Sequence, residues 1–213
     1  MKTRSKALLL TLCAVLLVAA SVLGTMAYLT SSDTVTNTFT VGSVAIKLDE
    51  AQANTDGTLV PNAERVKANS YKLLPGHTYS KDPMVTVLSG SEPSYVKMTV
   101  TFSKANELDA IFAPGGADLT KIFNGYDPAN WTYKDNTTDV TANTRTYEFW
   151  YKEAVGAPNG DVALDALFDS ITVPGSVTKE QLATIEGMTI TVNAYAIQAD
   201  GFADADAAWA AFN

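Results

Sequence analysis

The chain has 213 residues, 46% of them hydrophobic, and its 15 Lys and Arg against 23 Asp and Glu give a net charge of −8 at pH 7. An acidic balance argues against nucleic acid and anionic membranes as partners, because both attract basic proteins. The chain has one cysteine, Cys13, so no disulfide forms within it.

Residues 1–27 have the pattern of a secretory signal peptide. Three basic residues, Lys2, Arg4 and Lys6, precede an apolar run over 7–23, and small residues lead to a cleavage site between Ala27 and Tyr28. A retained membrane anchor is the alternative, since the run lies at the short end of the roughly 17–25 residues that a spanning helix needs. Cleavage leaves one domain, 28–213, with no cysteine, a net charge of −11 and no stable membrane span.

Alternation of apolar and polar residues predicts a series of half-buried strands. The expected strands are 34–41, 44–48, 85–88, 95–103, 147–151, 168–173 and 188–196. Pro and Gly turns separate them, and short helices are expected at 106–112, 178–185 and 204–212. Residues 51–70 and 132–146 are polar and predict long surface loops. Many short strands with little helix predict an all-β fold, a jelly-roll-like two-sheet β-sandwich.

No catalytic residue, metal ligand or cofactor site is predicted. The only histidine, His77, lies in the turn Leu74–Thr78, where a lone histidine is usually solvated. Zinc sites commonly use at least two His or Cys ligands, and no glycine-rich phosphate motif occurs. The acidic residues Asp200, Asp204 and Asp206 favour either a calcium site or, more simply, the acidic start of the last helix.

The first expected strand has two possible partners. Its odd positions Val35, Asn37, Phe39 and Val41 share one face, and threonines occupy the other. The strand can pair within its own domain, or it can leave a gap that the same strand of a neighbouring molecule fills. A head-to-tail exchange of this kind does not close on itself, so it builds a filament. Burial of the three apolar side chains would contribute about 5–8 kcal/mol before entropy, at roughly 1.5–3 kcal/mol each.

The stretch GTMAYLTSSDTVTNTFTVGSVAIKLDE, residues 24–50, resembles the start of the TasA/camelysin family of exported bacterial proteins. The matching residues are Thr25, Ala27, Tyr28, Thr30, Asn37-Thr38-Phe39-Thr40 and Gly42. Weaker similarities follow along nearly the whole chain, at 81–83, 95–97, 147–151, 167–174 and 196–209. The segment Leu29–Ser32 differs from the aromatic-acidic start of some relatives, which leaves the cleavage point and the register of the strand open.

The resemblance implies a jelly-roll domain that a SipW-type signal peptidase processes and that is secreted to the cell surface or extracellular matrix of a bacterium. It also implies a biofilm fibre subunit that forms a head-to-tail homopolymer, alone or with other matrix components. Carried onto this chain, the donor strand is 28–41, with Tyr28, Val35, Asn37, Phe39 and Val41 as assembly residues. Two alternatives remain: a camelysin-type surface metallo-endopeptidase, and a monomeric module that binds matrix sugar or protein.

Overall fold

The structure, a computed structural model, describes residues 3–26, 42–112 and 123–212. The chain divides into two units, Met1–Val41 and Gly42–Asn213. In the first unit the structure describes helix α1 (Thr3–Met26). Among the described residues, none of the helices combines the length and the apolar character required to cross a bilayer. The expected strand 34–41 and the cleavage site at Ala27 and Tyr28 lie outside the described residues.

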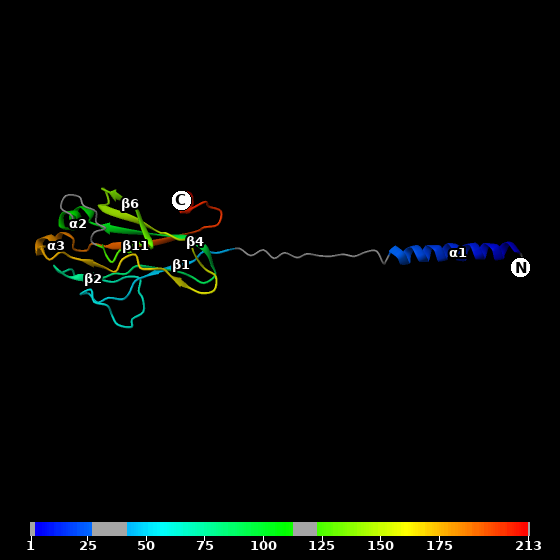
Figure 1. Cartoon of the computed structure of the whole chain (residues 1–213), viewed down its shortest axis with the longest axis horizontal. Helices are drawn as coiled ribbons and strands as arrows, with labels where there is room; N and C mark the ends of the chain where they lie inside the picture. Colours follow the sequence, from blue (N-terminus) through cyan, green and yellow to red (C-terminus); the bar gives the residue numbers. More distant parts are fainter. Residues whose placement is uncertain (1–2, 27–41, 113–122, 213) are drawn as a thin grey trace. The chain divides into compact units, whose positions relative to one another are not determined.

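The second unit is mostly β-structure in three antiparallel sheets, with few short helices (Figure 1). The first sheet has the order β1 (Ile46–Asp49), β3 (Met84–Val87), β9 (Val162–Ala163). The second has the order β2 (Thr78–Ser80), β10 (Ser170–Thr172), β5 (Phe123–Asn124). The third has the order β11 (Ile190–Gln198), β4 (Ser91–Ser103), β7 (Thr144–Tyr151), β6 (Trp131–Asp139), and β8 (Val155–Ala157) also pairs with β4.

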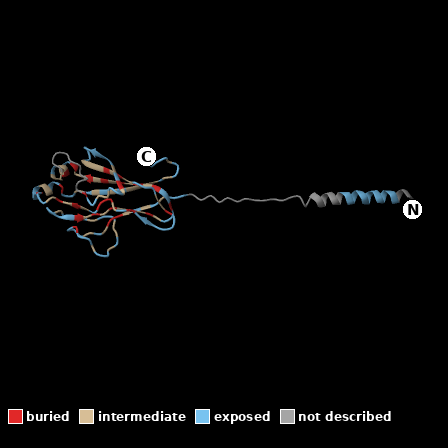
Figure 2. Cartoon of the chain, viewed as in Figure 1, coloured by how far each residue is buried: buried red, intermediate tan, exposed pale blue. Residues whose placement is uncertain are grey.

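These sheets make a sandwich-like fold, in which the third sheet faces the two smaller ones, and Figure 2 marks buried residues along the strands of both layers. The predicted all-β sandwich-like class is therefore confirmed. The central strand β4 shows why the sequence folds in this way. Val96, Met98, Val100 and Phe102 are fully buried on its inner face, while lysine and threonine alternate with them on the outer face.

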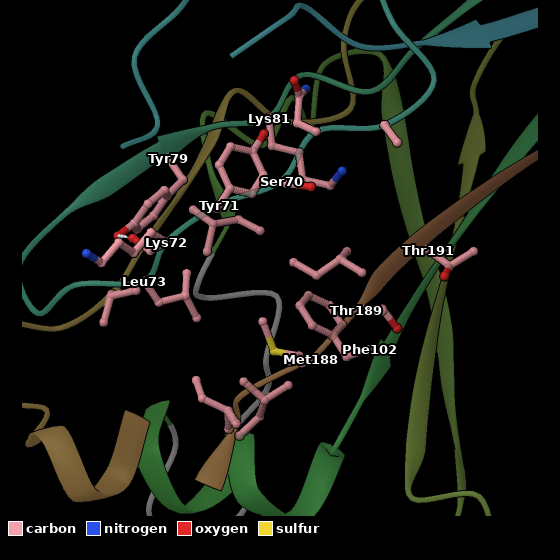
Figure 3. A pocket seen from close by; sticks show the side chains of 18 of the residues that line it. Ser70, Tyr71, Lys72, Leu73, Tyr79, Lys81, Phe102, Met188, Thr189 and Thr191 are labelled. Atoms are coloured by element: carbon pink, nitrogen blue, oxygen red, sulfur yellow. Dashed lines mark hydrogen bonds between the residues drawn. The ribbon is translucent and has the colours of Figure 1, made fainter. Parts of the chain in front are cut away.

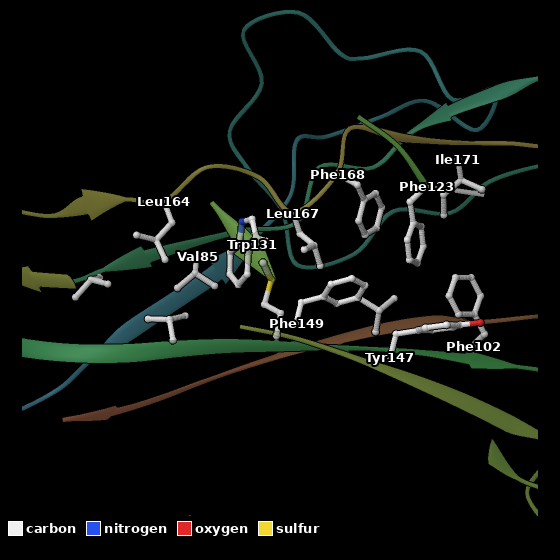
Figure 4. Close-up of a cluster of buried hydrophobic side chains, with 14 of the residues drawn as sticks. Val85, Phe102, Phe123, Trp131, Tyr147, Phe149, Leu164, Leu167, Phe168 and Ile171 are labelled. Carbon is white, nitrogen blue, oxygen red and sulfur yellow. The ribbon is translucent and has the colours of Figure 1, made fainter. Parts of the chain in front are cut away.

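An aromatic cluster fills the space between the layers (Figure 4). Phe168 stacks on Phe123 with ring centroids 4.4 Å apart, and Phe123 meets Tyr147 and Phe149 edge-on. The indole of Trp131 is fully buried, and its Nε1 donates a hydrogen bond to the Asp165 carbonyl at 3.0 Å. Such rings bury large apolar areas, so this cluster holds the two layers together without any disulfide.

The helices begin and end close to their expected positions. They are α2 (Ala105–Phe112), α3 (Lys179–Thr184) and α4 (Ala205–Ala211). Thr178 caps α3 in a capping box, because its hydroxyl accepts from the Gln181 N–H and the Gln181 side chain accepts from the Thr178 N–H. Phe212 packs against Tyr195 of β11 and Trp209 packs against Trp150 of β7, so α4 folds back onto the third sheet, as expected for the terminal helix.

The prediction of a surface loop over 132–146 is wrong, because β6 and β7 form a hairpin there. Residues 134–139 of β6 are exposed, and this edge strand is rich in Lys, Asp, Asn and Thr. Polar residues on an edge strand discourage pairing with other molecules. The apolar alternation that identifies a half-buried strand is therefore missing from most of this strand.

Candidate functional site

A groove of about 1290 Å³ opens between β11 and the chain segment 66–75 (Figure 3). Its floor is apolar and includes Phe102, Leu108 and Ile171. One wall is formed by α3 and by residues 188–192 at the start of β11, and the other by segment 66–75 together with Tyr79 and Lys81. Half-buried side chains such as Leu73 and Met188 face the space from the two walls, so the groove presents an elongated apolar surface.

The β11 wall is the edge of a sheet. In the described part of the chain, β11 pairs only with β4, over Ile190–Gln198 opposite Ser94–Phe102. The backbone groups on the other edge of β11 therefore have no strand partner there. An unpaired edge beside an apolar groove is suited to an additional strand, whose backbone would extend the sheet and whose alternate side chains would enter the groove.

The facing wall is held in place by tyrosine hydroxyls rather than by a sheet. Tyr79 donates to the Lys72 carbonyl at 2.8 Å and accepts from the Leu74 N–H at 2.6 Å, and Tyr71 donates to the Ser80 carbonyl at 2.6 Å. Burial, followed by the negative charge of Glu50, raises the pKa of Tyr71 above its ordinary value. Burial also raises the pKa of Tyr79. Both hydroxyls therefore remain protonated donors, and they fix an extended segment that is not part of any described sheet.

A network of charged residues surrounds Asp49, which lines the groove at the end of β1. Arg65 donates to Asp49 Oδ1 at 2.5 Å and to Asp82 Oδ2 at 2.8 Å, and it also bonds the carbonyls of both residues. Burial acts to raise the pKa of Asp49, but hydrogen bonds from Lys47 and Arg65 outweigh it, so the pKa of Asp49 is lowered. This network ties the polar segment 51–65 to β1 and to the start of β3.

The chain joins the second unit beside the start of β4, whereas Phe102 of the groove floor lies near the end of that strand. Glu92 N–H donates to the Ser43 carbonyl at 2.9 Å, and Ser43 forms a parallel bridge with Ser91. Phe102 lies 11 residues further along β4, which corresponds to about 36 Å at roughly 3.3 Å per residue. The 14 residues 28–41 span at most about 46–50 Å when extended. An extended segment 28–41 is therefore longer than the stretch of β4 between Ser91 and Phe102.

Sequence prediction identified the donor residues Tyr28, Val35, Asn37, Phe39 and Val41, and all of them lie outside the described residues. The structure therefore does not place them in the groove. Sequence reasoning did not identify the groove itself, because its walls come from segments more than 100 residues apart. The one available signal was the strand pattern of 188–196, but a pattern does not reveal which edge of a strand remains unpaired.

Other residues considered in the sequence are placed more simply. His77 is exposed in its turn, where its ring lies 6.4 Å from that of Tyr79. Asp204 caps α4 by accepting from the Ala207 N–H at 2.9 Å, and Asp206 pairs with Lys134 at 3.1 Å. These contacts of Asp204 and Asp206 agree with the interpretation of these residues as the acidic start of the last helix. Within residues 3–26, 42–112 and 123–212, no three His, Cys, Asp or Glu side chains are grouped as metal ligands would be.

Comparison with protein-family models, curated proteins and solved structures found no match.

Proposed function

We propose that this protein is a secreted structural protein, a subunit of a biofilm-matrix or surface fibre. In this proposal a SipW-type signal peptidase cleaves after Ala27, and the mature chain is exported to the extracellular matrix or the cell surface. The domain 42–213 is a jelly-roll sandwich that lacks one strand. Segment 28–41 of a neighbouring molecule supplies that strand, as the resemblance to the TasA/camelysin family implies.

The observation that carries the proposal is the apolar groove beside the edge of β11 that has no strand partner among the described residues. Segment 28–41 has the chemistry to fill it. Its residues Val35, Phe39 and Val41 alternate with threonines, and it contains no proline. Paired with β11, the segment would direct its apolar face onto Phe102 and Met188 while its threonines stayed on the opposite face.

The positions of donor and groove favour a neighbouring molecule as the source of the strand. Segment 28–41 is attached at Gly42, beside the start of β4, whereas the groove floor includes Phe102 near the end of β4. A chain that filled its own groove would have to reverse direction before β1. An end-to-end neighbour needs no reversal, and repetition of the same contact gives a filament.

The test compares the mature chain, residues 28–213, with a version that begins at Gly42. The second unit contains its own core between the sheets, so the shorter version retains that core. Electron microscopy and sedimentation should show filaments for residues 28–213 and soluble monomers for 42–213. Monomers of both versions at high protein concentration and under slow acidification would refute the proposal.

A further inference from the structure

A buried carboxylate lies between a lysine and an asparagine at the edge of the groove. Glu50 Oε2 accepts from Lys81 Nζ at 2.6 Å, and Glu50 Oε1 accepts from Asn69 Nδ2 at 3.0 Å. The side chains of Lys81 and Glu50 are only 9% and 8% exposed. Lysine and glutamate are rarely buried to this extent, so this pair requires an explanation beyond ordinary surface ion pairing.

The asparagine is fixed as firmly as the lysine. Its Oδ1 accepts from the Ala53 N–H at 2.8 Å, and its Nδ2 donates to the Ala51 carbonyl at 2.9 Å in addition to Glu50. A backbone N–H on the amide oxygen is the arrangement that stabilises negative charge there when a nucleophile attacks the amide carbon. The amine and the amide each donate to one oxygen of the same carboxylate, so a single acid lies within hydrogen-bond reach of both groups.

We propose that Lys81 and Asn69 join through an intramolecular isopeptide bond and that Glu50 carries the protons. The Lys81 ammonium transfers a proton to Glu50 Oε2, and the freed electron pair of Nζ attacks Asn69 Cγ. The negative charge that develops on Oδ1 is stabilised by the Ala53 N–H. Glu50 passes the proton to Nδ2, the Cγ–Nδ2 bond breaks and ammonia leaves. The new Nζ–Cγ amide loses its excess proton to Glu50 or to the departing ammonia, so no external reactant is needed.

The surroundings suit this reaction. Because the pair is buried, water is largely excluded from the amine, and a positioned amine reacts with a neighbouring group far faster than it would in solution. Tyr71, which lies on the same wall of the groove as Lys81, keeps its hydroxyl on the Ser80 carbonyl and does not compete for Glu50 (Figure 3). Arg65 is occupied by Asp49 and Asp82, which leaves Glu50 as the acid that faces Lys81.

The bond would replace a disulfide in a domain that has no cysteine after Cys13. It would join segment 66–70 covalently to the connection between β2 and β3 and close a ring between residues 69 and 81. A short covalent ring restricts the unfolded chain and keeps this wall of the groove in position. This inference does not depend on the identity of the molecule that fills the groove.

The test is mass spectrometry of the intact, denatured protein followed by tryptic digestion. The expected intact mass is lower than the sequence mass by one ammonia molecule. Acylated Lys81 resists trypsin, so peptide 68–72, which contains Asn69, should remain joined to peptide 73–97 as one branched species. Fragmentation of that species should place the link between Asn69 and Lys81.

Variants give the matched comparison. Lys81→Arg retains the positive charge and Glu50→Gln retains the shape, and each should show the full sequence mass and separate peptides. Glu148→Gln changes the Lys97–Glu148 pair, where no asparagine is bridged, and should keep the ammonia loss. Separate peptides 68–72, 73–81 and 82–97 from the wild-type protein would overturn the inference. So would an ammonia loss confined to peptide 68–72, because a succinimide at Asn69 produces that result.

Discussion

Replacement of Phe39 by alanine tests whether the odd face of segment 28–41 enters the groove. In our proposal this ring is buried against a floor that includes the fully buried Phe102 and the nearly fully buried Leu108. Burial of a phenylalanine side chain contributes about 1.5–3 kcal/mol. Since each 1.4 kcal/mol is a factor of ten, Phe39→Ala should weaken the binding of the strand by about 10- to 150-fold.

The assay is calorimetric titration of the domain 42–213 with a synthetic peptide of residues 28–41. The wild-type peptide should bind with a stoichiometry of one and raise the thermal midpoint of the domain, because a ligand that binds only the folded state stabilises it. Thr38→Ala, on the other face of the strand, is the matched control and should change the affinity little. Equal losses of affinity for the Phe39→Ala and Thr38→Ala peptides would refute the assignment of the two faces of the strand. Absence of binding by the wild-type peptide would refute the groove as its binding site.

Three further predictions concern the domain itself. Phe168→Ala removes a fully buried ring that stacks on Phe123, and it should destabilise the domain by about 3–5 kcal/mol in urea unfolding. A loss of stability below about 1 kcal/mol would contradict the packing described. Asp204→Ala removes the N-terminal cap of α4 and should lower the free energy of unfolding by about 1 kcal/mol, which corresponds to a fall of about 2–4 °C in Tm. An unchanged Tm would contradict the role of Asp204 as the cap. The pKa of Asp49 is lowered, so the stability that this carboxylate contributes is present above the unfolded value of 3.8 and is lost as the pH falls through the lower folded pKa. The difference in unfolding free energy between the wild type and Asp49→Asn should therefore be full at pH 6 and shrink below pH 4. A difference independent of pH would contradict the ion pairs.

The local structure of the sandwich could be predicted well from the sequence. Residues 95–103 alternate so regularly that the central strand was expected close to its observed position in β4. Thr178 followed by Glu180 and Gln181 indicates the start of α3, because the residues that begin a helix are a local signal. The β6 strand was missed for the opposite reason, since residues 134–139 are exposed and carry no apolar alternation.

The candidate sites could not be predicted, because they depend on contacts between distant segments. Leu73 and Met188 form facing walls of one groove although 115 residues separate them. Similarly, no sequence motif links Glu50, Asn69 and Lys81. Only the fold brings the Glu50 carboxylate within hydrogen-bond distance of the Lys81 amine and the Asn69 amide. Local periodicity identifies the buried face of a strand, but it does not identify the neighbours of that face.

Disulfide trapping tests the central claim, that the strand comes from another molecule, most directly. Residues 28–213 contain no cysteine, so in a chain of these residues Asn37→Cys on the proposed donor face and Ile190→Cys at the groove introduce the only thiols. Two populations, each with one of these substitutions, are mixed and oxidised, with Val35→Cys and Phe39→Cys as alternative donor positions that cover the register. We predict covalent dimers between the two populations, and a ladder of multimers from the chain that carries both substitutions. A doubly substituted chain that closes a disulfide only within its own monomer, together with the absence of mixed dimers, would contradict the account.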